Sequence, residues 1–312
     1  MQRLATWALI LLAAILLATL AIPAHAQAGL KVWPTRVELS VNRGEVAIAT
    51  VNVHNEGDMP ATVCVYIMDF CIDRDGRFVF TEPGHESYSA SEWLSVGNTD
   101  LKLGPGESRE VEVVVAVPTN PEPGGHYAAI FFETGPSTNE DGVPISTRIP
   151  SLFYITVPGV TDADVRADAE IVSLVLPGLV EQAPVQAGVV VKNTGNVHLT
   201  VAATAYFKGL SGRNSSLDLE QMTLLPDGEG TLTGNWRELP YIGRVRASIV
   251  IGYFDEQGEV VNKSQSGDFL VIPWKQLTAI AIAVGLAVAV VVFSFRSSRL
   301  RSGRERETRT PS

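Results

Sequence analysis

Apolar and polar residues alternate along most of the chain with the period of two that is typical of β-strands with one buried face. The clearest run is Ser108–Val117, in which valines alternate with Glu110 and Glu112. Clusters of Gly, Pro, Asn and Asp separate the runs, as turns separate the strands of a sandwich. Similar runs predict further strands at Val46–Val53, Ala61–Phe70, Tyr127–Glu133, Leu152–Val157, Glu170–Leu176, Val185–Lys192, Val197–Phe207, Gly230–Trp236, Arg244–Phe254 and Phe269–Ile272.

The run pattern occurs twice in the same order. The segment Val51–Gly57 (VNVHNEG) resembles Val189–Gly195 (VVVKNTG), and each leads into a long apolar strand. A turn after Leu103 (LGPGE) is likewise echoed by one after Leu225 (LPDGE). Because the order is repeated, we predict an all-β protein made of two tandem immunoglobulin-like β-sandwich domains. The polar stretch near Gly159–Ala167 has the composition of a linker.

The C-terminal region predicts a membrane span. Leu277–Phe295 holds 19 residues without a charge, which as a helix is just long enough to cross a bilayer core. Six arginines follow within the next 14 residues. Arginines beside a span hold that end in the cytoplasm, so the tail is predicted to be cytoplasmic and the preceding domains extracytoplasmic, in a single-pass cell-membrane protein.

The N-terminus predicts export. Arg3 is followed by an apolar run, then Pro23 and the small-residue sequence Ala24–Ala28, which is typical of a cleaved signal peptide. A retained anchor is the alternative, because the apolar run is long. The predicted organisation is a signal peptide at 1–26, a first domain at 29–158, a linker at 159–167, a second domain at 168–273, a transmembrane helix at 277–295 and a basic tail at 296–312.

Charge and cysteine content narrow the function classes. The chain has 24 Lys and Arg against 34 Asp and Glu, and several of the basic residues lie in the tail. The acidic ectodomain argues against nucleic-acid binding. Cys64 and Cys71 are seven residues apart in one apolar stretch, CVYIMDFC. Along a strand they are too far apart for a disulfide, so we predict two buried free thiols unless a sharp bulge intervenes.

Catalytic motifs are absent from the sequence. The mature histidines have no metal-ligand spacing, and there is neither a nucleophile elbow nor a glycine-rich phosphate loop. We therefore predict a non-enzymatic protein without cofactor or metal. A hydrolase remains an alternative, since acidic side chains distant in sequence can meet in a fold.

A family resemblance appears in the first domain. The ordered features are Asn55-x-Gly57, a strand ending Asp69-Phe70, Asp75-Gly76, Tyr88-Ser89-x-Ser91-x-Trp93-Leu94, Leu103-x-Pro105-Gly106-Glu107 and Val117-Pro118 through Pro123-Gly124-Gly125-x-Tyr127. Over Val32 to about Val157 this succession resembles the WxL-interacting proteins of bacterial cell surfaces, in particular their N-terminal peptidoglycan-binding domain. The resemblance implies a signal peptide, two immunoglobulin-like domains, one C-terminal span and a basic tail. The second domain matches only as a generic sandwich.

Three of the matched positions, Asp69, Tyr88 and Trp93, are the predicted ligand contacts. Tyr88 and Trp93 lie on a segment of small polar residues, where aromatic rings can stack on a sugar or anchor a partner. The alternative is that Trp93 and Leu94 begin a strand and fill the core, because Leu94 and Val96 continue the alternation.

The predicted function is therefore that of a membrane-anchored surface protein that binds peptidoglycan, an exported surface protein, or both. Strand addition at a sandwich edge is a second binding mechanism beside sugar stacking. A chaperone or assembly factor for an exported protein is the rival interpretation. Within the span, Ala281, Gly285 and Ala289 share one helix face, and small residues at this spacing favour helix association.

Overall fold

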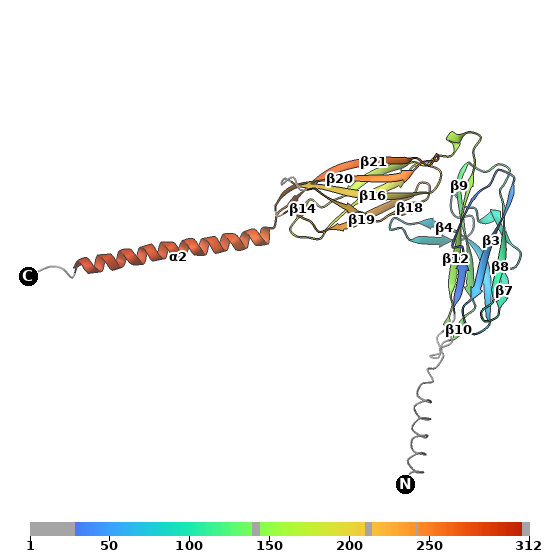
Figure 1. The fold of residues 1–312 in the computed structure, drawn as a ribbon, viewed down its shortest axis with the longest axis horizontal. Helices are drawn as coiled ribbons and strands as arrows, with labels where there is room; N and C mark the ends of the chain where they lie inside the picture. The colour runs from blue at the N-terminus through green and yellow to red at the C-terminus, as the bar shows by residue number, and fades with distance from the viewer. Residues whose placement is uncertain (1–28, 139–143, 210–213, 241, 308–312) are drawn as a thin grey trace, which may run out of the picture. The chain divides into compact units, whose positions relative to one another are not determined.

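The computed structural model describes residues 29–138, 144–209, 214–240 and 242–307, with the side chains of the last helix described as far as Phe293. The predicted signal peptide and the side chains of the predicted basic tail lie outside this part of the chain. Apart from a hairpin tip, Cys71–Val79, the first compact unit ends at Pro158 and the second begins at Gly159. Each unit has its own set of strands (Figure 1).

The first unit is a sandwich of two sheets. The smaller sheet has the order β1-β3-β8-β6, and the larger has the order β2-β12-β9-β4-β5, with β7 also paired to β4. A two-stranded ladder, β10-β11, accompanies them. The strands are β1 (Leu30–Trp33), β2 (Arg36–Ser40), β3 (Val46–Asn55), β4 (Ala61–Ile72), β5 (Phe78–Thr81), β6 (Leu94–Val96), β7 (Asp100–Leu103), β8 (Ser108–Ala116), β9 (Gly124–Thr134), β10 (Ser137–Thr138), β11 (Pro144–Ile145) and β12 (Arg148–Val157), with the 3-10 helix η1 (Ser91–Trp93) before β6.

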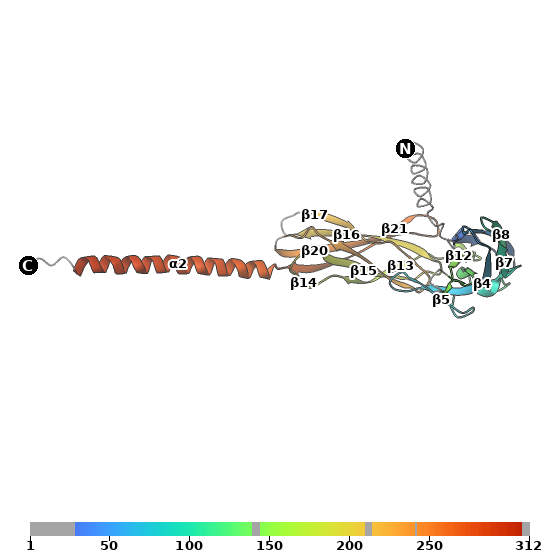
Figure 2. The ribbon, with the colours of Figure 1, turned by 90° about the horizontal axis from the view of Figure 1, so that it is seen from below.

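The second unit is a sandwich of the same kind, followed by a helix (Figure 2). One sheet has the order β13-β15-β19, and the other has the order β14-β21-β20-β16-β17, with β18 also paired to β16. Its elements are the 3-10 helix η2 (Asp162–Asp164), β13 (Ala169–Val175), β14 (Leu179–Val180), β15 (Val185–Asn193), β16 (Leu199–Gly209), β17 (Asn214–Asp218), β18 (Met222–Leu224), β19 (Glu229–Trp236), β20 (Gly243–Phe254), β21 (Val260–Val271) and α2 (Trp274–Glu307).

The predicted fold class is confirmed. The two sandwiches are all-β, and α2, the one long helix among the described residues, begins three residues after β21. Within α2, Trp274–Phe293 is long and apolar enough to cross a membrane and has no part buried against the protein. The alternation in β8 acts as expected, since Val111, Val113 and Val115 are buried and Glu110 and Glu112 are exposed.

The repeated Asn-x-Gly segment has a buried asparagine in the first sandwich. Asn55, at the end of β3, donates its side-chain amide to the carbonyl groups of Met59 (2.8 Å) and Gly104 (3.1 Å). Its side-chain oxygen accepts the backbone N–H of Gly57 (3.0 Å). Because Met59 leads into β4 and Gly104 follows β7, this one side chain ties the end of a strand in the smaller sheet to two strands of the larger sheet.

The second sandwich repeats this arrangement at Asn193, which is fully buried at the end of β15. The Asn193 amide donates to the carbonyls of Val197 (2.8 Å) and Leu224 (3.0 Å), and its oxygen accepts the N–H of Gly195 (2.9 Å). The sequence repeat is therefore a repeat of one hydrogen-bonding device, called here the asparagine clamp, at Asn55 and Asn193.

One expectation about the cysteines needs correction. Cys64 and Cys71 form no disulfide, as predicted, but the prediction that both are buried is wrong, because Cys64 is exposed and Cys71 is half-buried. Cys64 lies on the outer face of β4, whereas the neighbouring Val63 and Val65 face the core. The alternation continues through the cysteines, so an apolar run does not place every member inside.

The predicted linker 159–167 is ordered against the second sandwich. Asp164 caps η2 by accepting the N–H groups of Val160 (2.7 Å) and Thr161 (2.9 Å). The backbone carbonyl of Arg166 accepts the N–H of Asn196 (2.9 Å). A Cβ atom at Gly195 would overlap that same carbonyl, which explains the glycine there.

Replacing a clamp residue is expected to destabilise its sandwich. Asn193→Ala removes three hydrogen bonds and leaves two buried carbonyls and one N–H without this partner, which costs about 3 kcal/mol. Urea denaturation of the ectodomain measures the loss. Asn262→Ala, at an exposed position of β21, is the matched control and should change the free energy of unfolding by less than about 0.5 kcal/mol. Equal effects of the two substitutions would contradict the clamp.

Candidate functional site

The first sandwich has an open strand edge on β3. On one side β3 pairs with β8 along Val46–His54. On the other side its partner β1 covers only Asn52–Asn55. Among the described residues, no strand pairs with Val46–Val51 on that second side. This segment, called here the β3 edge, is long enough to accept one further strand.

The backbone geometry shows which groups the β3 edge offers. The N–H of Val117 donates to the carbonyl of Glu45 (3.0 Å), and the N–H of Asn55 donates to the carbonyl of Glu107 (3.0 Å). In an antiparallel pair such bonds recur at every second residue, so the odd-numbered residues of β3 bond to β8. The N–H and C=O groups of Val46, Ile48 and Thr50 therefore point away from β8, toward the open side.

Apolar side chains accompany this edge. Val46 and Ile48 lie on the outer face of the smaller sheet, and each side chain is 63% exposed. Their partners across the ladder are Ala116 and Val114. An edge with unpaired backbone groups and an exposed apolar surface is the arrangement that proteins normally avoid, because it invites a further strand.

Other edge strands carry features that oppose strand addition. On β2, Arg36 and Glu38 form an ion pair (2.6 Å). On β13, a bulge interrupts the ladder between Ile171 and Ser173. Charges and bulges are the usual protection of edges, and the β3 edge carries neither.

The sequence contains a signal for this edge that the alternation analysis missed. In Val46–Asn55, the large apolar residues at Val46 and Ile48 have even numbers, whereas those at Val51 and Val53 have odd numbers. The hydrophobic pattern thus changes phase within one strand. Since strand direction does not change, Val51 and Val53 face the core and Val46 and Ile48 face solvent.

Of the three predicted ligand contacts, Asp69 is placed where it cannot meet a ligand directly. Its side chain is fully buried. The carboxylate accepts the N–H of His85 (2.8 Å), the N–H of Glu86 (3.2 Å) and the hydroxyl of Ser89 (2.6 Å). The prediction of direct contact is therefore corrected, because the buried carboxylate of Asp69 is occupied by hydrogen bonds that hold the segment 82–93.

Tyr88 and Trp93 are both half-buried, and each connects the segment 82–93 to β9 through a different contact. The carbonyl of Tyr88 accepts the N–H of Tyr127 on β9 (2.8 Å). The Trp93 ring packs on His126, with ring centroids 4.3 Å apart, and against the core of the sandwich. Burial lowers the pKa of His126, so this ring contact involves a neutral imidazole near pH 7. The alternative prediction, that Trp93 and Leu94 pack in the core, thus agrees with the structure, and only part of the Trp93 ring is exposed to solvent.

The outer face of the larger sheet carries a layer of aromatic side chains. Residues Gly124–Phe132 of β9 are buried throughout, because the sandwich core takes one face and an aromatic layer takes the other. In that layer Phe70 packs against Tyr127 and Tyr154, and Phe80 packs edge-on against Phe131 with centroids 4.7 Å apart. These aromatic side chains bury the outer face around β9, whereas Val46 and Ile48 are exposed on the outer face of the smaller sheet.

The predicted helix-association face lies on α2. Ala281, Gly285 and Ala289 are exposed, and a Cβ atom at Gly285 would meet nothing within 4 Å. Association through this face remains a prediction, since the structure describes a single chain.

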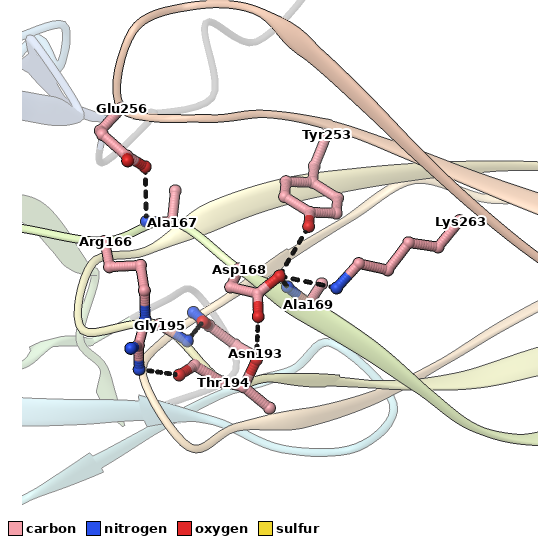
Figure 3. A network of polar contacts seen from close by, with 10 residues as sticks. All are labelled: Arg166, Ala167, Asp168, Ala169, Asn193, Thr194, Gly195, Tyr253, Glu256 and Lys263. Carbon is pink, nitrogen blue, oxygen red and sulfur yellow. Dashed lines mark hydrogen bonds and ion pairs between the residues drawn. The ribbon is translucent and has the colours of Figure 1, made fainter. Parts of the chain in front are cut away.

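A polar network joins the start of the second sandwich to its strands (Figure 3). The carboxylate of Asp168 accepts hydrogen bonds from Lys263 (2.7 Å), Tyr253 (2.8 Å) and Thr194 (3.0 Å). Burial acts to raise the pKa of Asp168, but the hydrogen bonds from Lys263, Tyr253 and Thr194 outweigh it and lower the pKa from 3.8 to about 2. These hydrogen bonds join the residue before β13 to the clamp turn and to β20 and β21, so we assign the network a structural role.

The Asp168 network is expected to add an acid-sensitive term to stability. A carboxyl whose pKa is lowered in the folded state stabilises that state above the unfolded pKa near 4, and the contribution is lost as the pH falls toward 2. Because the side chain is 39% exposed, screening reduces the effect to about 1 kcal/mol. Asp168→Asn should be less stable than the natural ectodomain at pH 6, and urea denaturation curves of the two should converge at pH 2. A constant difference across this range would contradict the network.

No family model matches the chain, and no curated protein matches it. The chain is similar to a chain in the complex of the SafA pilin with the SafB chaperone from Salmonella enterica, at 14% identity and a TM-score of 0.42, covering 80% of this chain and 99% of the other. It is also similar to the DraB chaperone of E. coli (13% identity, TM-score 0.40, 78% and 98% covered) and to the Pseudomonas aeruginosa CupB2 chaperone (12% identity, TM-score 0.39, 78% and 100% covered). Likeness of this size does not indicate function.

Proposed function

We propose that this chain is a non-enzymatic, membrane-anchored protein whose first sandwich binds an extended segment of an exported partner protein by strand addition at the β3 edge. The observation that carries the proposal is the open edge itself, where Val46, Ile48 and Thr50 direct unpaired backbone groups outward. In strand addition, main-chain hydrogen bonds supply affinity, and pockets or patches for alternate side chains supply selectivity.

The apolar patch indicates the chemistry of the partner segment. A strand added beside Val46–Val51 places every second side chain on the outer face, next to Val46 and Ile48. A segment with β-branched or aromatic residues at alternate positions fits that surface best, because such residues pack well on a pleated face. An assembly factor that holds an unpaired strand of an exported subunit and a receptor for a folded surface protein would both use this contact.

Membrane anchoring is supported by α2. Trp274–Phe293 is apolar and uncovered, and the arginines that follow it favour a cytoplasmic tail. Peptidoglycan binding through Tyr88 and Trp93 stays a prediction of the family resemblance. The packing of Trp93 on His126 counts against it, because that contact covers part of the ring that a sugar would stack on.

Proline at the β3 edge tests strand addition. Ile48→Pro removes an outward N–H and leaves the β3–β8 hydrogen bonds intact, because those are made by odd-numbered residues. With the full chain in its own host, a photo-crosslinker at Thr50 captures the partner, and binding to that protein is then measured. The Pro variant should lose about tenfold or more in affinity, equivalent to about 1.4 kcal/mol.

Ile48→Thr is the matched control, since it keeps the backbone donor and the β-branched shape. It is expected to retain most of the affinity. A partner that binds the Pro variant as tightly as the natural chain would rule out the β3 edge as its binding site. Retention of the ectodomain on purified peptidoglycan would instead favour the predicted peptidoglycan binding.

Topology is tested separately by protease accessibility. If the two sandwiches face outward, protease added to cells stripped of any outer wall should digest both and leave only a short fragment that contains α2. An epitope placed after Ser312 reports the protected fragment by immunoblot. Digestion of the epitope with the sandwiches intact would reverse the proposed orientation.

A further inference from the structure

The second sandwich is polarised along its strands. Strands β13, β16, β19 and β21 all run toward the end from which α2 departs, called here the helix end. The other strand ends form the clamp end, where Asn193 lies. The residues near the two ends differ in both charge and hydrophobicity.

The helix end has an apolar rim. Leu179 on β14 and Leu270 on β21 are paired neighbours on the outer face, with side chains 57% and 45% exposed. Ile242 comes directly before β20, whose first residue, Gly243, pairs with Val271, and its side chain is also exposed. Trp274, the first residue of α2, is the fourth exposed member.

Charge is distributed in the same direction. The described basic residues at the helix end are Lys208, Arg237, Arg244, Arg246 and Lys275, against Glu181, Glu238 and Asp268. At the clamp end the described acidic residues include Glu170, Asp227, Glu229, Asp255, Glu256 and Glu259, against Arg166, Lys192 and Lys263. An excess of basic residues at one end of an acidic ectodomain favours an anionic partner at that end.

The position of the span identifies that partner. Only Ile272 and Pro273 separate β21 from Trp274, so the end of β21 lies within about 11 Å of the first residue of the span. Trp274 donates its indole N–H to Glu181, and Lys275 pairs with Glu181 (3.4 Å), so the start of α2 is held to the β14 segment. A bilayer crossed by α2 therefore lies directly beside the apolar rim.

We propose that the helix end of the second sandwich rests in the headgroup region of an anionic lipid surface, with Leu179, Ile242, Leu270 and Trp274 as the inserted rim. This inference depends on the membrane span in the proposed function. Amphipathic surfaces of this kind settle about 5–10 Å into the boundary between headgroups and acyl chains, and nearby Lys and Arg add attraction to anionic lipids. Tryptophan at the start of a span is typical of the same interface. The sandwich would then be seated on the membrane rather than swinging on the helix.

The proposed contact between the helix end and the membrane is called here the seat, and it is tested by measuring how deeply residue 179 lies in the bilayer. The full chain with Cys64→Ser and Cys71→Ser receives one cysteine, by Leu179→Cys, for an environment-sensitive fluorophore. It is reconstituted into vesicles of phosphatidylcholine and phosphatidylglycerol that carry a nitroxide-labelled headgroup. We expect a blue-shifted emission and strong quenching. The matched control is Val260→Cys, an exposed valine at the other end of β21, which should show neither change.

The outcomes separate the two proposals. Failure of the chain to float with vesicles would remove both the span and the seat, whereas flotation with equal, weak quenching at both positions would overturn the seat alone. Arg244→Glu with Arg246→Glu should reduce quenching at position 179. Hydrogen exchange of the unaltered chain is an independent readout. Protection of residues 176–182 that is stronger in vesicles than in detergent supports the seat, and equal exchange in the two would count against it.

Discussion

The asparagine clamp is the constraint on which each sandwich depends. A strand that leaves one sheet and enters the other must turn where backbone groups are buried, and such groups need partners. Asn55 and Asn193 supply these partners with one amide each, since the side chain both donates and accepts. With this turn fixed, the registers of the flanking strands follow, and the two hydrophobic clusters close between the sheets.

The first sandwich differs from the second in how its outer faces are used. Asp69 binds the segment 82–93 through hydrogen bonds, and an aromatic layer fills the outer face of the larger sheet. A buried carboxylate with three donors is well satisfied, so the segment is firmly attached to the end of β4. On the smaller sheet the apolar residues Val46 and Ile48 are exposed, so a partner can reach them.

The two proposed contacts lie in separate units and use different physics. The β3 edge offers directional backbone hydrogen bonds with a small apolar patch, which suits a peptide strand. The helix end offers a rim of isolated apolar side chains among basic residues, which suits a disordered lipid surface and requires no register. In these proposals the first sandwich binds the partner and the second sandwich rests on the membrane, so the two roles do not compete for the same surface.

The sequence alone determined the fold class, the repeated domain and the apolar span, because strand alternation, Asn-x-Gly turns and a long uncharged run are local properties. Tertiary structure decided the rest. It buried Asp69 and left Cys64 exposed, since alternation defines two faces of a strand but not which neighbours cover them. It also showed that β1 stops short of Val51, which opens the β3 edge. Pairing lengths between strands distant in sequence depend on the packing of the whole sandwich, and no local pattern encodes them.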